Sequence, residues 1–591
     1  MTATSRRITV RYGGASSGSG PLTLGQDNMI RCIRSDLPEQ INKEAAWPVP
    51  DGTTLTAALD ALRALVERHD SLRTVFPPGP GPDAFPECQE VCAEGEFAVT
   101  VLDAPGLPAA ALDRLAEEAG RTDVAVPFDL AAGPRLRFTL LADGDRAARL
   151  VVVVCHAGAD GVATTLLIED WLALAAGKEL PPVTARTPLE VAAREQGEQG
   201  RRKAAAALGH WRKILTTRPQ TVFADSRITG PADRAAAVVL RSRTAGADLA
   251  AASRRTGASP SVVLLAAFAA LVAQRAGHSA LVLTALSANR QRAAMADHIG
   301  TLAQDALLAL DADAVDLDEL IGRAKAASLA GYWHSTLPAG NVWQLIEDVA
   351  HLRGTRFARQ VVINDLSLTI PEAMSDARPA PTSDPELTWL PDPPLPVRIM
   401  LNLLRTSGSL EFVLLACPQV LDRAETERFA LALPAVLKAA VHGPFPLADL
   451  PGLTGVPSAV RTGAWAVVDG GWIDLDAARS LVVDALGGAE SASGVTSGIT
   501  AEILGTAVEL VDGRLVARIA TRRPGLTPLA AHRAVVAAIP GRDTAMAPHH
   551  YVVHTATGPR PSGPIAWGTL PVTAEGAGRD PDIVGPTADS P

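Results

Sequence analysis

The sequence predicts an α/β (α+β) protein with two large lobes and a small C-terminal α+β subdomain. Helix and strand patterns alternate along residues 20–190 and again along residues 191–450. A short β-branched run at 151–154 is typical of a strand buried on both faces. A break near residues 446–457 then sets off a final segment, 455–575. Because 591 residues exceed the usual size of a single core, we expect three units with these boundaries.

The first lobe is expected to begin after a loose leader, because residues 1–20 end in glycine and serine. The run at 151–154 is followed by apolar residues at helical spacing, so a loop joins a strand to a helix there. The expected elements, in order, are a helix at 55–68, a strand at 71–76, a helix at 112–118, strands at 135–141 and 149–154, and a helix at 162–175.

The second lobe is expected to follow a charged helical stretch at 188–215. Its clearest patterns are a helix at 259–275 and a strand at 280–288. The prolines between 371 and 396 exclude a long helix or a central strand, so we expect a loop there. In the final segment, Asp512-Gly513 is typical of a hairpin turn. A helix at 526–539 and a strand at 551–553 are expected to follow.

Composition and charge exclude several classes of function. Hydrophobic residues make up 47% and charged residues 20%, as in globular proteins. A net charge of -10, with no long basic run, argues against a nucleic-acid partner. The chain start lacks the apolar core of a signal peptide, and no apolar run reaches the ~20 residues of a membrane span. Five cysteines, an odd number, fit a reducing compartment, so we expect a cytoplasmic protein without a membrane partner.

Chemistry-bearing residues follow the apolar run directly. His156 and Asp160 lie in the strand-to-helix loop, where polar side chains often line a cavity. An imidazole that titrates near neutrality can accept a proton, orient a nucleophile or stabilise charge. The alternative for His156 is a buried ring satisfied by the backbone. Asp160 is a candidate second acid or base, or a structural carboxylate, which if buried needs a charged partner.

At these residues the chain resembles the condensation-domain family of nonribosomal peptide synthetases, whose signature is His-His-x-x-x-Asp-Gly. The second histidine, the aspartate and the glycine are present as His156, Asp160 and Gly161, while Cys155 replaces the first histidine. The resemblance covers about residues 20–450. Further motifs similar to the family's stand in the same order at residues 22–26, 68–76, 128–134, 289–290 and 298–300, although the usual Phe-Val-Asn reads Leu302-Ala303-Gln304.

The resemblance implies two chloramphenicol-acetyltransferase-like lobes that form a V, with a tunnel between them. It implies that His156 is catalytic and that Asp160 pairs with Arg290 to hold the loop and the lobes in position. Gly161 is expected to allow close approach of backbone or substrate, or to adopt a positive φ. Cys155 is expected to point away from the ring of His156, because neighbours in extended backbone face opposite sides. Its replacement of histidine puts the usual support of the loop in question.

The final segment looks like the small C-terminal subdomain of adenylation enzymes. Where that family has a Gly-Lys, this chain has Gly563-Pro564, and the large subdomain with its phosphate loop is absent from the sequence, so we expect no ATP chemistry. We assign no metal site to His549, His550 and His554, because no carboxylate or cysteine completes a set. Residues 487–491 resemble a carrier attachment site with the wrong spacing, and Cys88 and Cys92 are expected to be ordinary thiols.

The resemblance therefore predicts a free-standing condensation enzyme. It is expected to join an acyl group, held as a thioester on the phosphopantetheine arm of a separate acyl or peptidyl carrier protein, to an amine or hydroxyl acceptor. We expect no metal or cofactor bound by the chain itself. Two alternatives stay open: a noncatalytic module that docks carriers or a synthetase, suggested by Cys155, and an acyltransferase of the same superfamily that uses coenzyme A directly.

Overall fold

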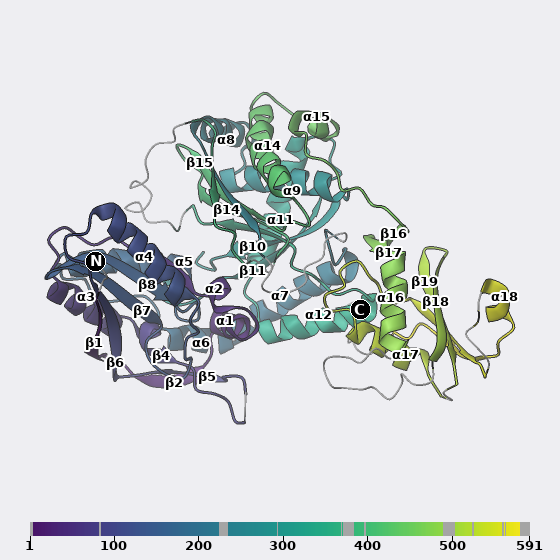
Figure 1. The fold of residues 1–591 in the computed structure, drawn as a ribbon, viewed down its shortest axis with the longest axis horizontal. Coiled ribbons are helices and arrows are strands. Elements are labelled where there is room, and N and C mark those ends of the chain that lie inside the picture. The colour runs from purple at the N-terminus through teal and green to yellow at the C-terminus, as the bar shows by residue number, and fades with distance from the viewer. Residues whose placement is uncertain are drawn as a thin grey trace.

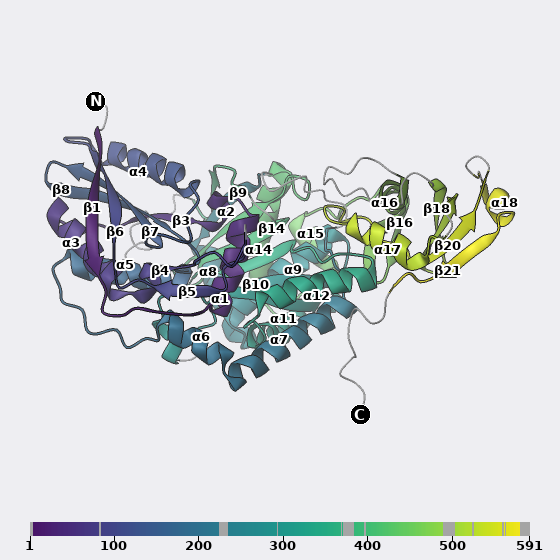
Figure 2. The same cartoon turned by 90° about the horizontal axis from the view of Figure 1, so that it is seen from below.

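The protein is described by a computed structural model. It describes residues 4–81, 84–223, 234–291, 293–367, 369, 383–394, 397–487, 503–522, 525–557, 561 and 563–579. Three bodies follow one another along the long axis of the molecule, namely the first lobe, the second lobe and the C-terminal segment (Figure 1). The same order is seen when the molecule is turned by 90° (Figure 2).

The first lobe is built on a five-stranded mixed sheet. Strand β8 continues the predicted apolar run and is buried on both faces, as expected from its β-branched composition. The strands, in spatial order, are β1 (Thr4–Gly13), β6 (Glu94–Asp103), β7 (Leu136–Asp143), β8 (Arg146–Val154) and β3 (Lys43–Trp47).

Helices cover both faces of this sheet. Helices α3 (Leu55–Arg68) and α5 (Gly161–Ala175) pack on one face, where Trp171 and Val152 belong to the same buried cluster. Helix α4 (Ala109–Val124) packs on the other face against Val151. Neighbouring residues of β8 therefore supply two separate cores. The shorter elements of this lobe and the helices that follow it are α1 (Leu24–Ser35), α2 (Pro38–Ile41), η1 (Asp70–Arg73), α6 (Pro188–Gln196) and α7 (Glu198–Thr217).

Two predictions in the first lobe are wrong. The described residues of the expected leader form β1, which pairs along its length with β6, and β2 (Gly18–Pro21), which pairs with β5 (Cys88–Val91). The strand expected at 71–76 is mostly the 3-10 turn η1, and only β4 (Thr74–Val75) is extended. The buried Arg73 donates to Asp70 Oδ1 at 2.6 Å, which closes this turn locally.

The second lobe contains a seven-stranded sheet with a cis Asp384-Pro385 bond just before its edge strand. Strands β10 and β12 pair in parallel, as do β12 and β14. The strands, in spatial order, are β11 (Gln304–Asp311), β10 (Ala280–Ser287), β12 (Val361–Asp365), β14 (Ile399–Arg405), β15 (Leu410–Ala416), β9 (Ala236–Ser242) and β13 (Glu386–Leu390).

Strand β13 corrects the loop expected at 371–396. It is an edge strand, a position that tolerates nearby prolines because one side of the strand needs no ladder bonds. Residues 371–382 and 395–396 of that stretch lie outside the described residues. The expected break at 446–457 also contains structure, namely η2 (Leu447–Asp449) and α15 (Leu450–Thr454).

The helices of the second lobe form its largest core. Helix α9 is buried on nearly all sides, which explains why its sequence is apolar all round. Within the described chain no single helix is long and apolar enough to span a membrane; α8 and α9 pass that test only together and are bent by 102°. The helices are α8 (Arg243–Thr256), α9 (Pro260–Ala276), α10 (Ala293–Ala296), α11 (Leu317–Trp333), α12 (Ala339–Arg353) and α14 (Arg423–Val441).

The C-terminal segment has its own core and a four-stranded sheet. The predicted hairpin is present, with positive φ at both Asp512 and Gly513. The segment packs on the second lobe, where Ala547 N donates to Gly354 O at 2.7 Å. Its elements are β16 (Trp465–Val468), β17 (Gly471–Asp474), α16 (Leu475–Gly487), β18 (Ile503–Val511), β19 (Arg514–Thr521), α17 (Pro528–Ala537), β20 (His550–Thr555), α18 (Gly563–Gly568) and β21 (Val572–Gly576).

Candidate functional site

The loop that follows β8 turns tightly between the strand and α5. The Cys155 carbonyl accepts hydrogen bonds from Gly158 N at 2.8 Å and from Ala159 N at 3.3 Å. A Cβ at Gly158 would lie 2.3 Å from Cβ of Arg135, so only glycine fits there. Gly158 lies between the signature residues His156 and Asp160, but it is not a predicted site residue.

His156 lies in this loop, four residues before Asp160, whose carboxylate contacts the second lobe. Its side chain is only partly exposed, and its Nδ1 is buried without a hydrogen-bond partner among the described residues. Burial, followed by the positive charge of Lys43, lowers the pKa of His156 to about 4, although Asp160 acts in the opposite direction. The imidazole is therefore neutral at physiological pH and able to accept a proton.

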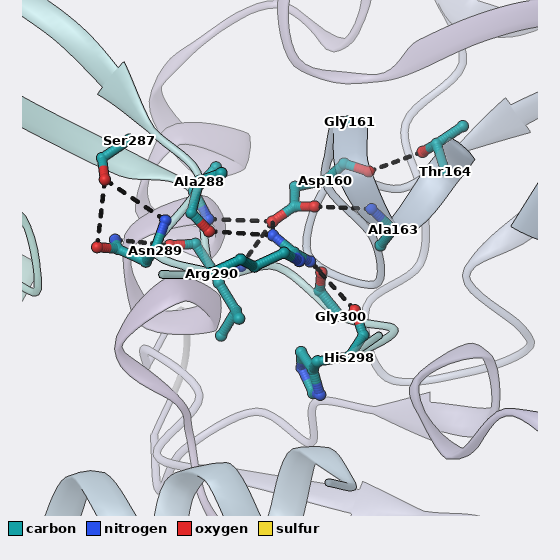
Figure 3. A network of polar contacts seen from close by, with 12 residues as sticks. Asp160, Gly161, Ala163, Thr164, Ser287, Ala288, Asn289, Arg290, His298 and Gly300 are labelled. Carbon is teal, nitrogen blue, oxygen red and sulfur yellow. Dashed lines mark hydrogen bonds and ion pairs between the residues drawn. The ribbon is translucent and has the colours of Figure 1, made fainter. Parts of the chain in front are cut away.

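Asp160 is held by four hydrogen bonds from both lobes (Figure 3). Its Oδ1 caps α5 by accepting from Ala163 N at 3.0 Å. Its Oδ2 accepts from Arg290 Nη1 at 2.7 Å, from Leu302 N at 2.8 Å and from Ala303 N at 3.1 Å. Burial alone would raise the pKa of Asp160, but Arg290 and the backbone donors outweigh it and lower that pKa. The carboxylate is thus ionised, and both of its oxygens accept hydrogen bonds.

Arg290 comes from the connection between β10 and β11. Its side chain is 7% exposed and that of Asp160 is 1% exposed, so the ion pair is buried. Arg290 Nη1 also donates to Ala288 O at 3.1 Å, and Nη2 donates to His298 O and Gly300 O at 3.2 and 3.1 Å. The guanidinium therefore ties its own loop together and fastens it to α5 of the other lobe.

Three further residues complete this network, and none of them is a predicted site residue. Asn289 has φ 54 and donates to Leu302 O and Ser335 O at 2.9 and 3.1 Å. His298 is buried, and its Nδ1 lies 2.7 Å from Arg186 O. Burial lowers the pKa of His298 to about 4. Only Asn289 and His298 stood in quoted motifs; Ser335 carried no local signal.

The residues at 302–304, which replace the family's usual Phe-Val-Asn, still hold the site together. Leu302 and Ala303 hold Asp160 through backbone amides, so their side chains do not enter these contacts. Gln304 Nε2 donates to Leu337 O at 2.7 Å and to Leu24 O at 3.2 Å. Gln304 thereby adds another link between the lobes.

Cys155 and Gly161 flank the charged group. Cys155 is fully buried in an apolar cluster with Ile30, Phe76 and Ala157. Gly161 does not have a positive φ, so that alternative for its role is wrong. A Cβ at Gly161 would have its nearest neighbours at 4.0 Å, in Leu366 and Thr369 of the second lobe. Among the described residues, a side chain of alanine size at position 161 would therefore meet no clash.

The motif at 68–76 supports the loop from behind. Arg68 Nε donates to Asp170 Oδ2 at 2.9 Å, and His69 Nε2 lies 2.8 Å from the same oxygen, which joins α3 to α5. Ser71 Oγ donates to Gly158 O at 2.5 Å. These contacts give the motif a structural role within the first lobe.

The remaining candidates are dispersed. His549 contacts Asp469 at 3.2 Å, His550 contacts Glu575 at 2.9 Å, and His554 contacts Leu570 O at 3.1 Å. In the part of the chain that is described, no group of three His, Cys, Asp or Glu residues could hold a metal ion. Cys88 and Cys92 are free thiols. Residues 488–491 of the possible carrier site lie outside the described residues.

Solved structures identify the fold of the two lobes. The two lobes have the chloramphenicol-acetyltransferase-like fold of condensation domains. SgcC5 from Streptomyces globisporus is 19% identical, with a TM-score of 0.55 over 72% of this chain and 100% of that one. The condensation domain of the Monacolin K polyketide synthase MokA is 17% identical, with a TM-score of 0.57 over 73% and 99%. The X-domain from teicoplanin biosynthesis is 21% identical, with a TM-score of 0.55 over 73% and 96%. At these identities the likeness concerns the fold.

The family follows from the sequence match. The condensation-domain family model matches residues 40–444, so the chain belongs to the condensation-domain family. Domains of this family serve in peptide-bond formation together with carrier proteins that bear phosphopantetheine. The match ends before the C-terminal segment, whose likeness to an adenylation subdomain stays a prediction.

Curated relatives are much longer than the matched region. Phosphinothricin tripeptide synthetase PhsC of Streptomyces viridochromogenes is 33% identical over 279 residues, or 44% of this chain and 25% of that protein. Chondramide synthase cmdD of Chondromyces crocatus is 26% identical over 426 residues, or 68% of this chain and 10% of that protein. The matched part of the chain thus spans a quarter or less of these synthetases.

Proposed function

We propose that this chain is a condensation enzyme that forms an amide bond between a carrier-bound acyl thioester and an amine acceptor, with His156 as its catalytic residue. The observation that carries the proposal is a neutral, partly exposed imidazole in the loop that Asp160 fastens to the second lobe. Its loop is held from both sides by the buried pair of Asp160 and Arg290. A rigid support of this kind favours a fixed position of the ring relative to two substrates.

The reaction balances with one proton transfer. The amine nitrogen attacks the thioester carbonyl carbon, a C–N bond forms, and the C–S bond breaks. The amine loses a proton to His156, and that proton passes to the sulfur of the leaving pantetheine thiol. The products are the amide and the free thiol of the carrier. A hydroxyl acceptor would follow the same balance and give an ester.

The other site residues act through position in this proposal. Asp160 accepts four hydrogen bonds and has Arg290 as its ionic partner, so we assign both residues to holding the loop and the lobes. We assign Gly161 to leaving room for substrate beside Leu366 and Thr369, the residues nearest to a Cβ at this position. We assign Cys155 no part in the reaction, because its side chain packs among apolar residues.

In this proposal the enzyme is free-standing, and it receives its donor on the phosphopantetheine arm of a separate acyl or peptidyl carrier protein. Family membership supports this choice of partner. The proposal also places the protein in the cytoplasm, which is supported by five cysteines that are all free thiols.

The test is an assay in trans that supplies acyl-loaded carrier and a panel of amines, with product detected by mass spectrometry. Replacing His156 by alanine should lower turnover by about 10²- to 10⁴-fold, the usual contribution of general acid–base catalysis. His550→Ala is the matched control, because His550 lies on the distant β20 and contacts only Glu575 among its recorded partners. That variant should keep wild-type turnover.

The two alternatives predict different results in the same assay. Carrier binding without turnover by the wild type would support a noncatalytic docking module, the reading that Cys155 in place of histidine favours. Turnover with acyl-coenzyme A that matches or exceeds turnover with carrier would support the coenzyme A-dependent acyltransferase. Equal turnover by wild type and His156→Ala would remove His156 from the mechanism.

A further inference from the structure

A lysine that the sequence analysis did not consider stands beside the catalytic loop. Lys43 is the first residue of β3, and its backbone is in register with Val154, the last residue of β8. Paired residues in antiparallel strands have Cα atoms about 5 Å apart. Since His156 follows Val154 by two residues, the flexible four-carbon stem of Lys43 starts next to the catalytic loop.

The helix before β3 lies at the junction of the lobes. Helix α2, which directly precedes β3, is placed between the two lobes in both views of the molecule (Figures 1 and 2). Lys43 Nζ donates to Gln40 O in that helix at 3.1 Å. An ammonium group has three donors, so two stay available for another acceptor.

Among the described residues, neighbouring acids do not balance the charge of Lys43. Glu44 turns to the opposite face of the sheet, where its Oε2 packs against Gly120 of α4. Asp160 is already occupied by Arg290 and backbone amides. Among the residues that the structure describes, no carboxylate is recorded within ion-pair distance of Lys43.

Lys43 is accessible and yet partly dehydrated. Solvent reaches its side chain, but surrounding protein strips enough water that burial lowers its pKa. Its positive charge is also the second cause, after burial, of the low pKa of His156. A cation of this kind gains most from an incoming anion, because charge attraction is strong where water is scarce.

We propose that Lys43 binds a carboxylate of the acceptor, so that the acceptor is an amino acid with a free carboxylate. The inference rests on the proposed function and names its substrate class. In the donor, the acyl carboxyl is already consumed by the thioester. In a free α-amino acid, the nucleophilic amine and the carboxylate share one carbon, so an amine placed at His156 brings the carboxylate close to the start of β3.

The test compares acceptors that differ only in this charge. The probes are glycine, alanine, leucine, phenylalanine and aspartate, each paired with its α-amide, and aspartyl and asparaginyl thioesters on a carrier protein. Binding is measured without donor by saturation-transfer NMR, and KM and kcat are measured with acyl-loaded carrier. The variants are Lys43→Gln, which removes the charge, and Lys43→Arg, which keeps it.

For the wild type, at least one free acid should bind about tenfold or more tightly than its amide, as expected for a charge-assisted hydrogen bond. Lys43→Gln should abolish this preference through KM, and Lys43→Arg should retain it. If only the aspartyl thioester bound more tightly than its asparaginyl counterpart, the acceptor would be carrier-bound and Lys43 would bind its side-chain carboxylate. Equal binding or no binding of acids and amides to the wild type, or a preference that persists in Lys43→Gln, would overturn the proposal. Binding that depends on Lys43 without any turnover would instead count against the proposed catalysis alone.

Discussion

Arg290 Nη1 lies 2.7 Å from Asp160 Oδ2, although 130 residues separate them along the chain and they belong to different lobes. The contact is buried, and three backbone amides complete the coordination of the carboxylate. Removing one member of such a pair leaves the other charge buried and unpaired. The stability of the lobe junction and the position of His156 therefore depend on the same pair.

Replacing Asp160 by asparagine should lower the free energy of unfolding by about 3–5 kcal/mol, because Arg290 would stay buried without its counter-charge. Urea denaturation followed by circular dichroism measures this loss. Glu96→Gln is the control, because Glu96 and Arg11 form an exposed pair with side chains 63% and 89% exposed. Exposed pairs contribute about 1 kcal/mol or less, so similar losses in both variants would contradict the structural role of Asp160.

The titration of His156 should depend on Lys43. With a pKa of about 4, the ring of His156 is neutral above that pH and becomes charged only as the pH falls through it. Because the positive charge of Lys43 disfavours the imidazolium, Lys43→Gln should raise the pKa of His156 towards its usual value. NMR of histidine-labelled protein measures the shift, and His156→Ala identifies the resonance. A wild-type pKa of 6.5 or higher would contradict the structure.

Two glycines at the junction should respond differently to alanine. A Cβ at Gly300 would lie 2.3 Å from His298 Nε2, so Gly300→Ala should destabilise the protein by about 1–3 kcal/mol through overpacking. Gly161→Ala meets nothing nearer than 4.0 Å and should change stability by less than about 1 kcal/mol.

If the space beside Gly161 admits substrate, Gly161→Ala should still lower turnover by about tenfold or more, since small displacements of reacting groups are costly. Thermal denaturation and the carrier assay separate the two effects. Full turnover in Gly161→Ala would show that substrate does not pass this glycine.

Cys155→Ala tests whether the thiol takes part in chemistry. Since Cys155 packs among Ile30, Phe76 and Ala157, the variant should keep turnover within about twofold and lose about 1 kcal/mol of stability. The carrier assay and urea denaturation measure both quantities. A loss of turnover comparable with that of His156→Ala would instead indicate a cysteine–histidine pair.

The docking of the C-terminal segment should depend on Asp543. Its Oδ2 accepts from Gln360 Nε2 at 2.9 Å and from the buried Arg398 Nη2 at 2.8 Å. Asp543→Ala should weaken docking by about 1–3 kcal/mol, because it leaves buried donors without this acceptor. Faster hydrogen exchange in α12 and α17, with α3 unchanged, is the expected signature.

The control for this prediction is Asp484→Ala. Asp484 pairs with Arg542 at 2.8 Å, but both side chains are well exposed, at 45% and 36%. It should leave hydrogen exchange in α12 unchanged. Unchanged exchange in Asp543→Ala as well would mean that other contacts hold the segment.

The sequence by itself determined the elements whose signals are local. The helix predicted at 55–68 has the same bounds in the structure, and the hairpin at Asp512 and Gly513 follows from residues that adopt positive φ readily. The resemblance to the condensation-domain family also implied the pair of Asp160 and Arg290, which the structure contains. Strand β1 differs from the predicted leader: its residues alternate between polar and apolar, while the glycines and serines near residue 20 are typical of a loop.

Tertiary structure alone decided the surroundings of His156. The proximity of Lys43 depends on the register of β3 against β8, and Ser335 joins the site only through the loop around Asn289. Ser71 of the 3-10 turn at 70–73 likewise meets Gly158 only through the tertiary fold, by donating a hydrogen bond to the Gly158 carbonyl. Local periodicity carries no information on which distant segments pair, because strand register and burial are set by the whole core. Charge balance and the pKa of His156 follow from that packing.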